Sequence, residues 1–393
     1  MISEKTKRGL SGGSVIRAMF TEGTRMAEEF GKENVYDFSL GNPATSAPEK
    51  ISREIVSPVT ESDPLTLHGY MNNAGFPEVR EAIAFDLNSR FHTSLHAGNI
   101  VMTTGAAGGL NVVLKTILDP GDEVIVFTPY FGEYKNYVSN YDGVLCEVNP
   151  DPKTFFPDLS DLEEKLSVRT KAVLINTPNN PTGVVYPEKV LEEIGRILSD
   201  AEERFSHEIY LISDEPYREL LYDNEKEIFV ASCYRDTITA YSFSKSLSLP
   251  GERIGYLAVS DECADKEDLL SGFSLSNRIL GFVNAPSLMQ KAVAGCLSER
   301  TDIAFYDKNR RALAEALSEM GFTFTPPKGA FYLWLKTPIG EAAFVEKAKE
   351  QHILLVNGSA FSYPGYVRIA YCVSPEVIER SKAGFRKLAE ACL

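Results

Sequence analysis

The sequence has none of the patterns that mark membrane-spanning, secreted or metal-binding proteins. Nowhere do about 18 uncharged apolar residues run together, and the polar start from Met1 to Arg17 has no apolar core of the signal-peptide type. The six cysteines are scattered, with no CxxC pair and no cysteine and histidine cluster at metal-ligand spacing. We therefore predict a cytoplasmic protein with reduced, mostly buried thiols, no membrane contact and no metal site.

Positive charge is also scarce, with 40 Lys and Arg against 55 Asp and Glu and a formal net charge of −15. Nucleic acids and anionic membranes would repel such a surface, so neither is an expected partner. No G-x-G-x-x-G opens a helix after a strand, which argues against a nicotinamide-dependent Rossmann enzyme. With 393 residues and no low-complexity tract or repeat, the chain suits a large domain with a smaller one.

Short β-branched runs alternate with longer amphipathic segments through the middle of the chain, which predicts an α/β fold with a mainly parallel sheet flanked by helices. The runs are residues 123–127, 172–176, 209–213 and 237–241. From about Gly295 the pattern changes to that of a smaller α+β domain. We predict an N-terminal segment (1–48) packed on that smaller domain, a large domain (49–295) and a C-terminal small domain (296–393).

Each of the four runs ends in a polar or Gly/Pro-containing motif. Ligands of open α/β sheets bind beyond the carboxyl ends of the strands, so these motifs are expected to converge on one crevice. The last motif contains Lys245, with Ser242 three residues before it and Arg253 eight after it. A lysine beside a hydroxyl and a guanidinium suits a Schiff base next to a phosphate. The alternative is an ordinary surface lysine in a serine-rich turn.

Asp214 follows an apolar strand, where a buried carboxylate needs a partner such as a pyridinium nitrogen. A helix cap or a structural salt bridge is the alternative. Tyr217, three residues later, and Asn180, in the turn Asn179-Asn180-Pro181-Thr182-Gly183, are candidates to reach the phenolic oxygen of the same ring. Asn-Pro-Thr-Gly alone is often only a turn.

Small residues at Gly105, Ala106 and Ala107 precede an apolar helical run from Val112 to Leu118, which predicts an anion seat at a helix N-terminus. Phe131 follows a strand and is a candidate to stack on a flat ring. Plain packing is the alternative for both features.

Arg368 interrupts the strand-like stretch from Tyr366 to Ala370, and an arginine there needs an anionic partner such as a carboxylate ligand. An interior salt bridge or an exposed edge position is the alternative. Gly41, before Asn42-Pro43, would let the backbone approach the same carboxylate.

Taken in order, these motifs resemble the class I/II aminotransferases, the fold-type-I pyridoxal-phosphate enzymes related to aspartate aminotransferase. The resemblance extends from Gly41 to Arg368, nearly the whole chain. It is carried by Gly41-Asn42-Pro43, Tyr70 ahead of Gly75-Phe76-Pro77-Glu78-Val79-Arg80, Gly105-Ala106-Ala107, Pro129-Tyr130-Phe131, Asn179 to Gly183, Asp214-Glu215-Pro216-Tyr217, Ser242 to Lys245, Arg253 and Arg368.

The resemblance implies a seven-stranded sheet of the pyridoxal-phosphate-dependent transferase fold and a ping-pong transfer of an amino group between an L-amino acid and a 2-oxo acid. It implies that Lys245 forms the Schiff base with pyridoxal 5'-phosphate and moves the substrate proton, while Asp214 holds the ring nitrogen. The other implied contacts are Asn180 and Tyr217 on the ring oxygen, Phe131 on the ring face, Gly105, Ala106, Ala107, Ser242 and Arg253 around the phosphate, and Arg368, with Gly41 and Asn180, at the substrate. Tyr70 would reach the phosphate in the neighbouring subunit, so a homodimer with shared sites is implied.

The amino donor stays open between an aspartate or glutamate type and an aromatic or broad type. Some bacterial aspartate aminotransferases have a lysine where this chain has Ala107, and Arg278, His68 and Tyr70 are the other polar candidates for the substrate side chain. A β-eliminating C-S lyase or an amino-acid decarboxylase would use the same lysine and aspartate. A non-catalytic ligand-sensing module is the alternative from another class.

Overall fold

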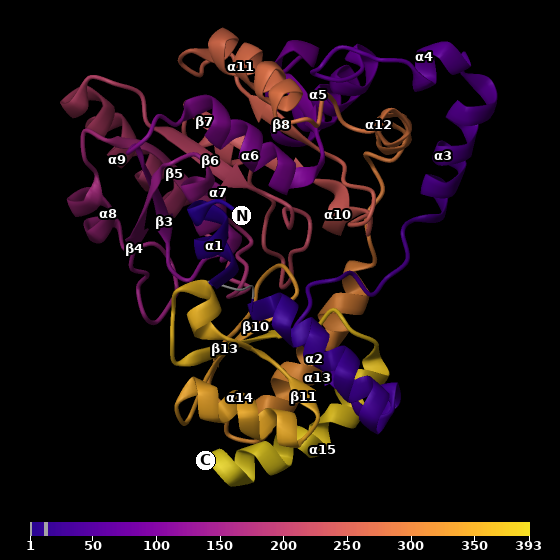
Figure 1. The fold of residues 1–393 in the computed structure, drawn as a ribbon, viewed down its shortest axis with the longest axis vertical. Helices are drawn as coiled ribbons and strands as arrows, with labels where there is room; N and C mark the ends of the chain where they lie inside the picture. Colours follow the sequence, from indigo (N-terminus) through magenta and orange to yellow (C-terminus); the bar gives the residue numbers. More distant parts are fainter. Residues whose placement is uncertain (1, 12–14) are drawn as a thin grey trace.

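The computed structural model describes residues 2–11 and 15–393, and a seven-stranded sheet forms the centre of its larger part (Figure 1). The strand order is β2-β8-β7-β6-β5-β3-β4. Strand β8 runs antiparallel to both of its neighbours, and the other pairs are parallel. The predicted α/β fold with a mainly parallel sheet is confirmed. The strands are β2 (Ile100–Thr103), β3 (Glu123–Phe127), β4 (Val144–Val148), β5 (Thr170–Asn176), β6 (Tyr210–Asp214), β7 (Thr237–Ser242) and β8 (Gly255–Val259).

Helices cover both faces of this sheet because its strands are apolar on both sides. In β3, Val124 and Val126 pack in the cluster with α6, α7 and α11, whereas Ile125 and Phe127 pack on the opposite face with α8 and α9. Helices α5 and α12 pack around β2 and β8. These helices are α5 (Pro77–Phe91), α6 (Gly105–Ile117), α7 (Glu133–Asn140), α8 (Leu159–Lys165), α9 (Glu188–Phe205), α11 (Lys266–Ile279) and α12 (Ser287–Ala294).

The smaller α+β unit lies below the large sheet in Figure 1. Its four-stranded antiparallel sheet has the order β12-β13-β10-β9. Aromatic and aliphatic side chains from this sheet and from three helices form one buried cluster. The elements are β9 (Phe324–Thr325), β10 (Tyr332–Lys336), β12 (Val356–Asn357), β13 (Tyr366–Ala370), α13 (Ile303–Glu319), α14 (Glu341–Glu350) and α15 (Pro375–Cys392).

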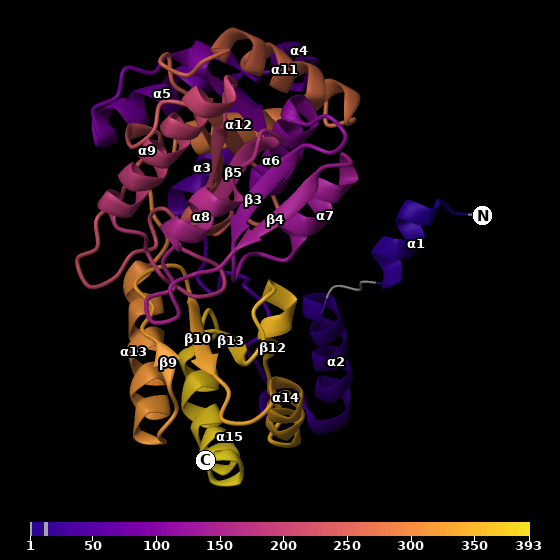
Figure 2. The same ribbon diagram turned by 90° about the vertical axis from the view of Figure 1, so that its left-hand side faces the viewer.

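The N-terminal segment contacts this smaller unit through β1 (Tyr36–Asp37), which pairs in parallel with β11 (Ile353–Leu354). Phe38 is fully buried in the core of the same unit. Helix α1 (Glu4–Ser11) projects from the body of the molecule (Figure 2), and α2 (Val15–Phe30), α3 (Glu49–Glu61) and α4 (Pro64–His68) follow it. The division into domains at residues 48 and 295 stays a prediction.

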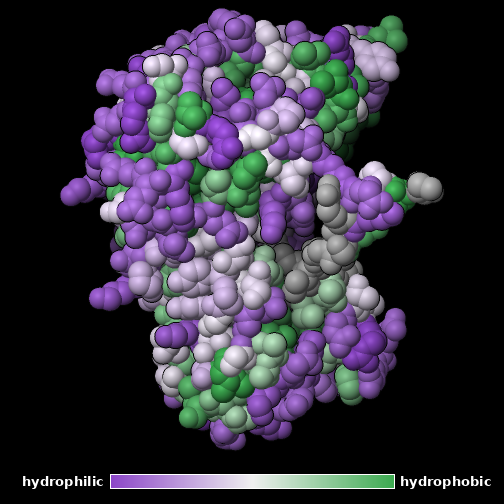
Figure 3. All heavy atoms as spheres, turned by 60° about the vertical axis from the view of Figure 1, so that its left-hand side comes forward, coloured by the Kyte–Doolittle hydropathy of each residue, from purple (hydrophilic) through white to green (hydrophobic). Residues whose placement is uncertain are grey.

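On the face shown in Figure 3, hydrophilic side chains predominate and hydrophobic ones form separate patches. Across residues 2–11 and 15–393, no helix combines the length and the apolar character needed to cross a bilayer. The six cysteines are free, and Cys263, Cys296 and Cys372 are buried whereas Cys146, Cys233 and Cys392 are half-buried.

Candidate active site

A cavity of about 260 Å³ lies beyond the carboxyl ends of the parallel strands, where motifs from distant parts of the chain meet. The sequence predicted that such motifs would converge, and the structure brings most of the predicted residues to this one cavity. The predicted residues that line it are Gly41, Ala106, Ala107, Phe131, Asn180, Asp214, Tyr217, Ser242, Lys245, Arg253 and Arg368.

Lys245 reaches the cavity from α10 (Phe243–Ser246), a single helical turn that follows β7 directly. Ser242 caps this turn by accepting a hydrogen bond from the backbone N–H of Ser244. The Nζ of Lys245 donates to the carbonyl oxygen of Gly41 at 2.6 Å. Burial, with help from the positive charges of Arg253 and Arg368, lowers the pKa of Lys245 to about 8. The amine can therefore lose its proton near neutral pH, as a nucleophile must.

Asp214 is the last residue of β6 and is only 6% exposed. Its Oδ2 accepts a hydrogen bond from the hydroxyl of Tyr134 at 2.6 Å, while its Oδ1 is buried with no partner among the described residues. Burial raises the pKa of Asp214 to about 7, although the hydrogen bond from Tyr134 acts in the opposite direction. A buried acceptor without a partner, facing a cavity, fits a cationic group that binds from the cavity side.

Sequence reasoning missed Tyr134, which is fully enclosed and lies in the first turn of α7. Phe131, just before this helix, packs edge-on against the Tyr134 ring, with 5.7 Å between centroids. Phe131 and Tyr134, three residues apart, thus place one aromatic ring in the cavity and a hydroxyl behind the carboxylate of Asp214. A single buried tyrosine looks like an ordinary core residue in a sequence, so no signal distinguished it.

Hydroxyl and guanidinium groups gather at one end of the cavity, where α6 begins. Ser242 and Ser244 are hydrogen bonded through their Oγ atoms at 2.8 Å, and both line the cavity. A Cβ added to Gly105, where φ is +74°, would lie 3.0 Å from Nη2 of Arg253. This glycine therefore lets the arginine approach the helix N-terminus, which makes the predicted seat for a phosphate. The sequence did not single out Ser244 as a ligand.

Arg368 lies in the middle of β13 and is 2% exposed. It donates to Oδ1 of Asn180 at 2.9 Å and to the carbonyl oxygen of Ser39 at 2.6 Å, while its Nε is buried without a partner in the described part of the chain. Its guanidinium is thus held in place by neutral acceptors rather than by a salt bridge. Such a cation can receive a carboxylate from the cavity. Because Oδ1 of Asn180 is occupied, the Nδ2 of this amide is left for a ligand.

Tyr217 meets a second tyrosine, Tyr332, at the first residue of β10. Their hydroxyl oxygens are 2.9 Å apart, and both rings line the cavity. A Cβ at Gly41 would lie 2.0 Å from the hydroxyl oxygen of Tyr332, so the close approach of these two residues requires a glycine. Sequence reasoning selected Tyr217 and Gly41 but treated Tyr332 only as part of a strand.

Some predicted residues lie outside the cavity. Gly105 is beside Arg253 but is not part of the lining. Tyr70 is 97% exposed, and His68 and Arg278 are also exposed. The proposed contact of Tyr70 with a neighbouring subunit and a role for Arg278 or His68 at the substrate stay predictions.

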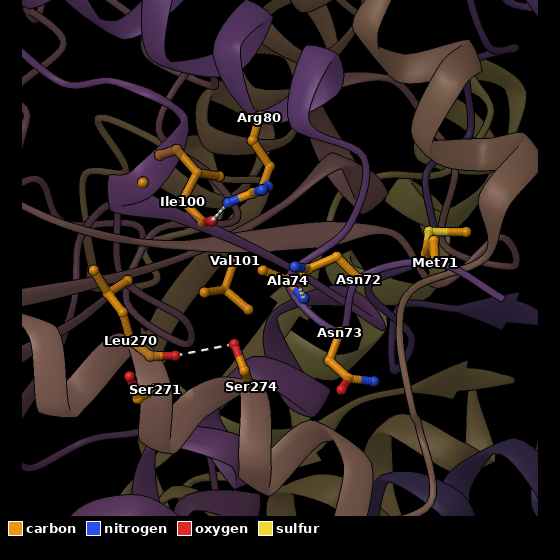
Figure 4. Close-up of a pocket in the computed structure, with 11 residues that line it drawn as sticks. Met71, Asn72, Asn73, Ala74, Arg80, Ile100, Val101, Leu270, Ser271 and Ser274 are labelled. Atoms are coloured by element: carbon orange, nitrogen blue, oxygen red, sulfur yellow. Dashed lines mark hydrogen bonds between the residues drawn. The ribbon is translucent and has the colours of Figure 1, made fainter.

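Arg80, from the motif that begins at Gly75, lines a different cavity of about 460 Å³ beside β2 and α11 (Figure 4). Its guanidinium donates to the carbonyl oxygens of Ala97 and Ile100, at 2.8 and 3.5 Å. These bonds attach α5 to the start of β2. Arg80 thus stabilises the strand that leads into Gly105, rather than contacting the cavity around Lys245.

A lysine, a buried carboxylate and an arginine around one cavity of an α/β fold are the groups expected of an enzyme that binds a small anionic ligand. Comparison with known proteins identifies the family of this chain. The sequence profile of "Aminotransferase class I and II" matches residues 33–381, and the chain belongs to this family. It is an aminotransferase, and enzymes of this family use pyridoxal 5'-phosphate.

Individual relatives agree with this assignment. An aspartate aminotransferase of Thermotoga maritima is 33% identical over 348 residues, 88% of each chain. An aromatic-amino-acid aminotransferase of Thermococcus litoralis is 31% identical over 91% of this chain and 92% of its own. The crystal structure of an amino transferase from Eubacterium rectale superposes with a TM-score of 0.96 at 42% identity, covering 100% of this chain and 99% of that one. The predicted resemblance and enzyme class are confirmed.

Proposed function

We propose that this aminotransferase binds pyridoxal 5'-phosphate in the cavity around Lys245 and transfers an amino group from an L-amino acid to a 2-oxo acid by a ping-pong mechanism. One observation carries the proposal: the Nζ of Lys245, the unpartnered Oδ1 of Asp214 and the guanidinium of Arg368 share a single cavity. These are an amine, an anion and a cation, each suited to a different part of one cofactor and substrate pair.

The residues present fit this cofactor. The buried, unpartnered Oδ1 of Asp214 suits a protonated ring nitrogen. The cradle at Gly105, with Arg253 and the hydroxyls of Ser242 and Ser244, suits a phosphate dianion.

When bound, the cofactor supplies an aldehyde that accepts an amino group and a ring that withdraws electrons from the substrate carbon. The side chains of the cavity then have distinct tasks. Lys245 would carry a proton between the α-carbon of the substrate and the aldehyde carbon of the cofactor. Asp214 keeps the ring nitrogen protonated, and Phe131 covers the ring face. Arg368 orients the substrate through its α-carboxylate.

The amino donor is open between two types, and the relatives include enzymes named for both. Among the described residues lining the cavity, the cations are Lys245, Arg253 and Arg368, each with a proposed task. Ala107 lines the cavity where some aspartate aminotransferases have a lysine. A second carboxylate on the donor would therefore require a cation from elsewhere in the assembly, and acidic and aromatic donors both belong in the test.

We also propose that the enzyme is a cytoplasmic homodimer with shared sites. Support comes from large apolar side chains that this chain leaves exposed near α4 and α5. Leu65 is 85% exposed, Tyr70 97% and Phe85 72%. A partner subunit would cover such side chains, and Tyr70 of one subunit would reach the cavity of the other.

The test is a panel of amino donors, with aspartate and phenylalanine first, each supplied with 2-oxoglutarate and the cofactor-loaded protein. A transaminase yields glutamate and the 2-oxo acid of the donor. A C-S lyase would yield pyruvate and ammonia from a suitable donor without an acceptor, and a decarboxylase would release carbon dioxide.

Lys245→Ala should lower turnover by at least about 10³-fold, because the proton carrier and the cofactor attachment are both lost. The partly exposed Lys328, which pairs with Asp223, provides a matched control, and Lys328→Ala should keep full activity. Retained activity in the Lys245 variant would refute the proposed role of this residue.

A further inference from the structure

Tyr332 lines the same cavity as Tyr217, and its hydroxyl is hydrogen bonded to that of Tyr217. Tyr332 is 2% exposed, and the two rings meet edge-on with 5.7 Å between centroids. The 2.9 Å separation of the hydroxyl oxygens means that one of them donates to the other.

We propose that Tyr332 is a positioning residue that donates its hydroxyl proton to Tyr217 and so directs the proton of Tyr217 toward the ring oxygen of the cofactor. The inference rests on the proposed function. A phenol has a single proton to donate, and an anionic ring oxygen only accepts. If Tyr217 donates its proton to the ring oxygen, it has none left for Tyr332. The hydrogen bond between the two tyrosines must then run from the hydroxyl of Tyr332 to the oxygen of Tyr217.

Gly41 confines the hydroxyl of Tyr332 to this arrangement. Because even a Cβ at Gly41 would lie 2.0 Å from the hydroxyl oxygen, the backbone closes that side. Any larger residue at position 41 would therefore displace the hydroxyl of Tyr332 from Tyr217. The same glycine accepts the hydrogen bond from Lys245, so the N-terminal segment positions both groups.

The ring of Tyr332 has a separate task. The guanidinium of Arg368 lies over this ring, 4.5 Å from its centroid. It also lies over the ring of Phe361, 4.9 Å from that centroid. A cation between two aromatic rings is held in position by both. The hydroxyl of Tyr332 therefore acts toward the cofactor ring oxygen, and its ring acts toward the α-carboxylate site. Different substitutions can separate the two.

The experiment is a pH titration of the visible absorbance of the cofactor-loaded protein, wild type and Tyr332→Phe. Phenylalanine keeps the ring and removes the donor, so negative charge on the ring oxygen is less stabilised. The titration midpoint should rise by roughly 0.5–1 pH unit. The KM for the amino donor should stay within about two-fold, because the ring over Arg368 is kept.

Tyr332→Leu should show the same midpoint shift and, in addition, a rise of roughly 3–30-fold in the donor KM, because the cation loses one ring. Tyr371→Phe is the matched control. The Tyr371 hydroxyl is also buried but donates to the carbonyl oxygen of Ala330 at 3.3 Å, so neither readout should change.

A double variant tests the direction. If Tyr332 acts through Tyr217, adding Tyr332→Phe to Tyr217→Phe should produce no further shift of the midpoint. A wild-type midpoint in Tyr332→Phe, with an unchanged circular dichroism spectrum and melting temperature, would overturn the inference and leave the proposed function intact. A wild-type protein that shows no visible band with the cofactor would overturn the proposed function itself.

Discussion

At the scale of single residues, the requirements of binding and of stability conflict at Asp214. A carboxylate buried at the end of β6, with one oxygen unpartnered, destabilises the cofactor-free fold when it ionises. The folded-state pKa of about 7 lies well above the ordinary value of 3.8, so the folded protein binds this proton more tightly than the unfolded chain. Stability from this group is complete below pH 3.8 and is lost as the pH rises through about 7.

Asp214→Asn should therefore stabilise the cofactor-free protein at pH 8, by roughly 2–4 kcal/mol, while abolishing most of the turnover. Asparagine has nearly the same shape, keeps an oxygen acceptor for Tyr134 and carries no charge to desolvate. The gain should shrink as the pH falls and disappear below about pH 4, where both proteins are neutral at this position. Urea unfolding of the cofactor-free wild type and variant at several pH values measures this difference in the free energy of unfolding. An asparagine variant that is less stable at pH 8 would contradict the argument.

At the scale of elements, α7 connects the ring-stacking position to the acid. Phe131 lines the cavity just before α7 begins, and the first turn of α7 aims the hydroxyl of Tyr134 at Asp214. Desolvation raises the pKa of Tyr134 well above its ordinary value, so this hydroxyl stays protonated and remains a donor. The helix thereby fixes which oxygen of Asp214 faces the cavity.

Tyr134→Phe should raise the pKa of Asp214 further and reduce turnover by roughly 5–20-fold at pH 7, with partial recovery at higher pH. The pH dependence of kcat is the measurement. Tyr130→Phe is the matched control, because that hydroxyl bonds to Glu147 at 2.7 Å instead of to Asp214. If the two variants lost the same amount of turnover, without a change in the pH profile, the role of Tyr134 would be packing alone.

The elements show what could be predicted from the sequence and what could not. Strands β3, β5, β6 and β7 were predictable because β-branched runs ended at Gly, Pro or polar motifs, and Lys245 and Asp214 came with them. Arg368 was noticeable because a charge inside an apolar strand needs a partner. Tyr134 and Tyr332 could not be predicted, because a tyrosine that only packs and a tyrosine that directs a proton look the same in a sequence. Their role depends on contacts between distant segments.

At the scale of the whole molecule, the cavity depends on the N-terminal segment and on both sheets. Gly41 comes from the N-terminal segment, Lys245 and Asp214 from the ends of the large sheet, and Tyr332 and Arg368 from the smaller sheet. Hydrogen bonds from Lys245 to Gly41 and from Arg368 to Asn180 cross between these parts. A displacement of the smaller unit would therefore move the carboxylate site away from the lysine and the acid.

The shared sites of the proposed dimer can be tested by mixing two defective variants, Lys245→Ala and Tyr70→Ala. Tyr70 is 97% exposed in the single chain, so its proposed contact lies in the partner's cavity. A mixed dimer would then contain one site with both residues intact. Random pairing gives half mixed dimers, so co-expression should restore about a quarter of wild-type activity, measured at limiting cofactor. Lys245→Ala mixed with Asp214→Asn is the control: both residues come from one chain, every site keeps a defect, and activity should stay at background. Equal activities in the two mixtures would show that Tyr70 does not act across a subunit boundary.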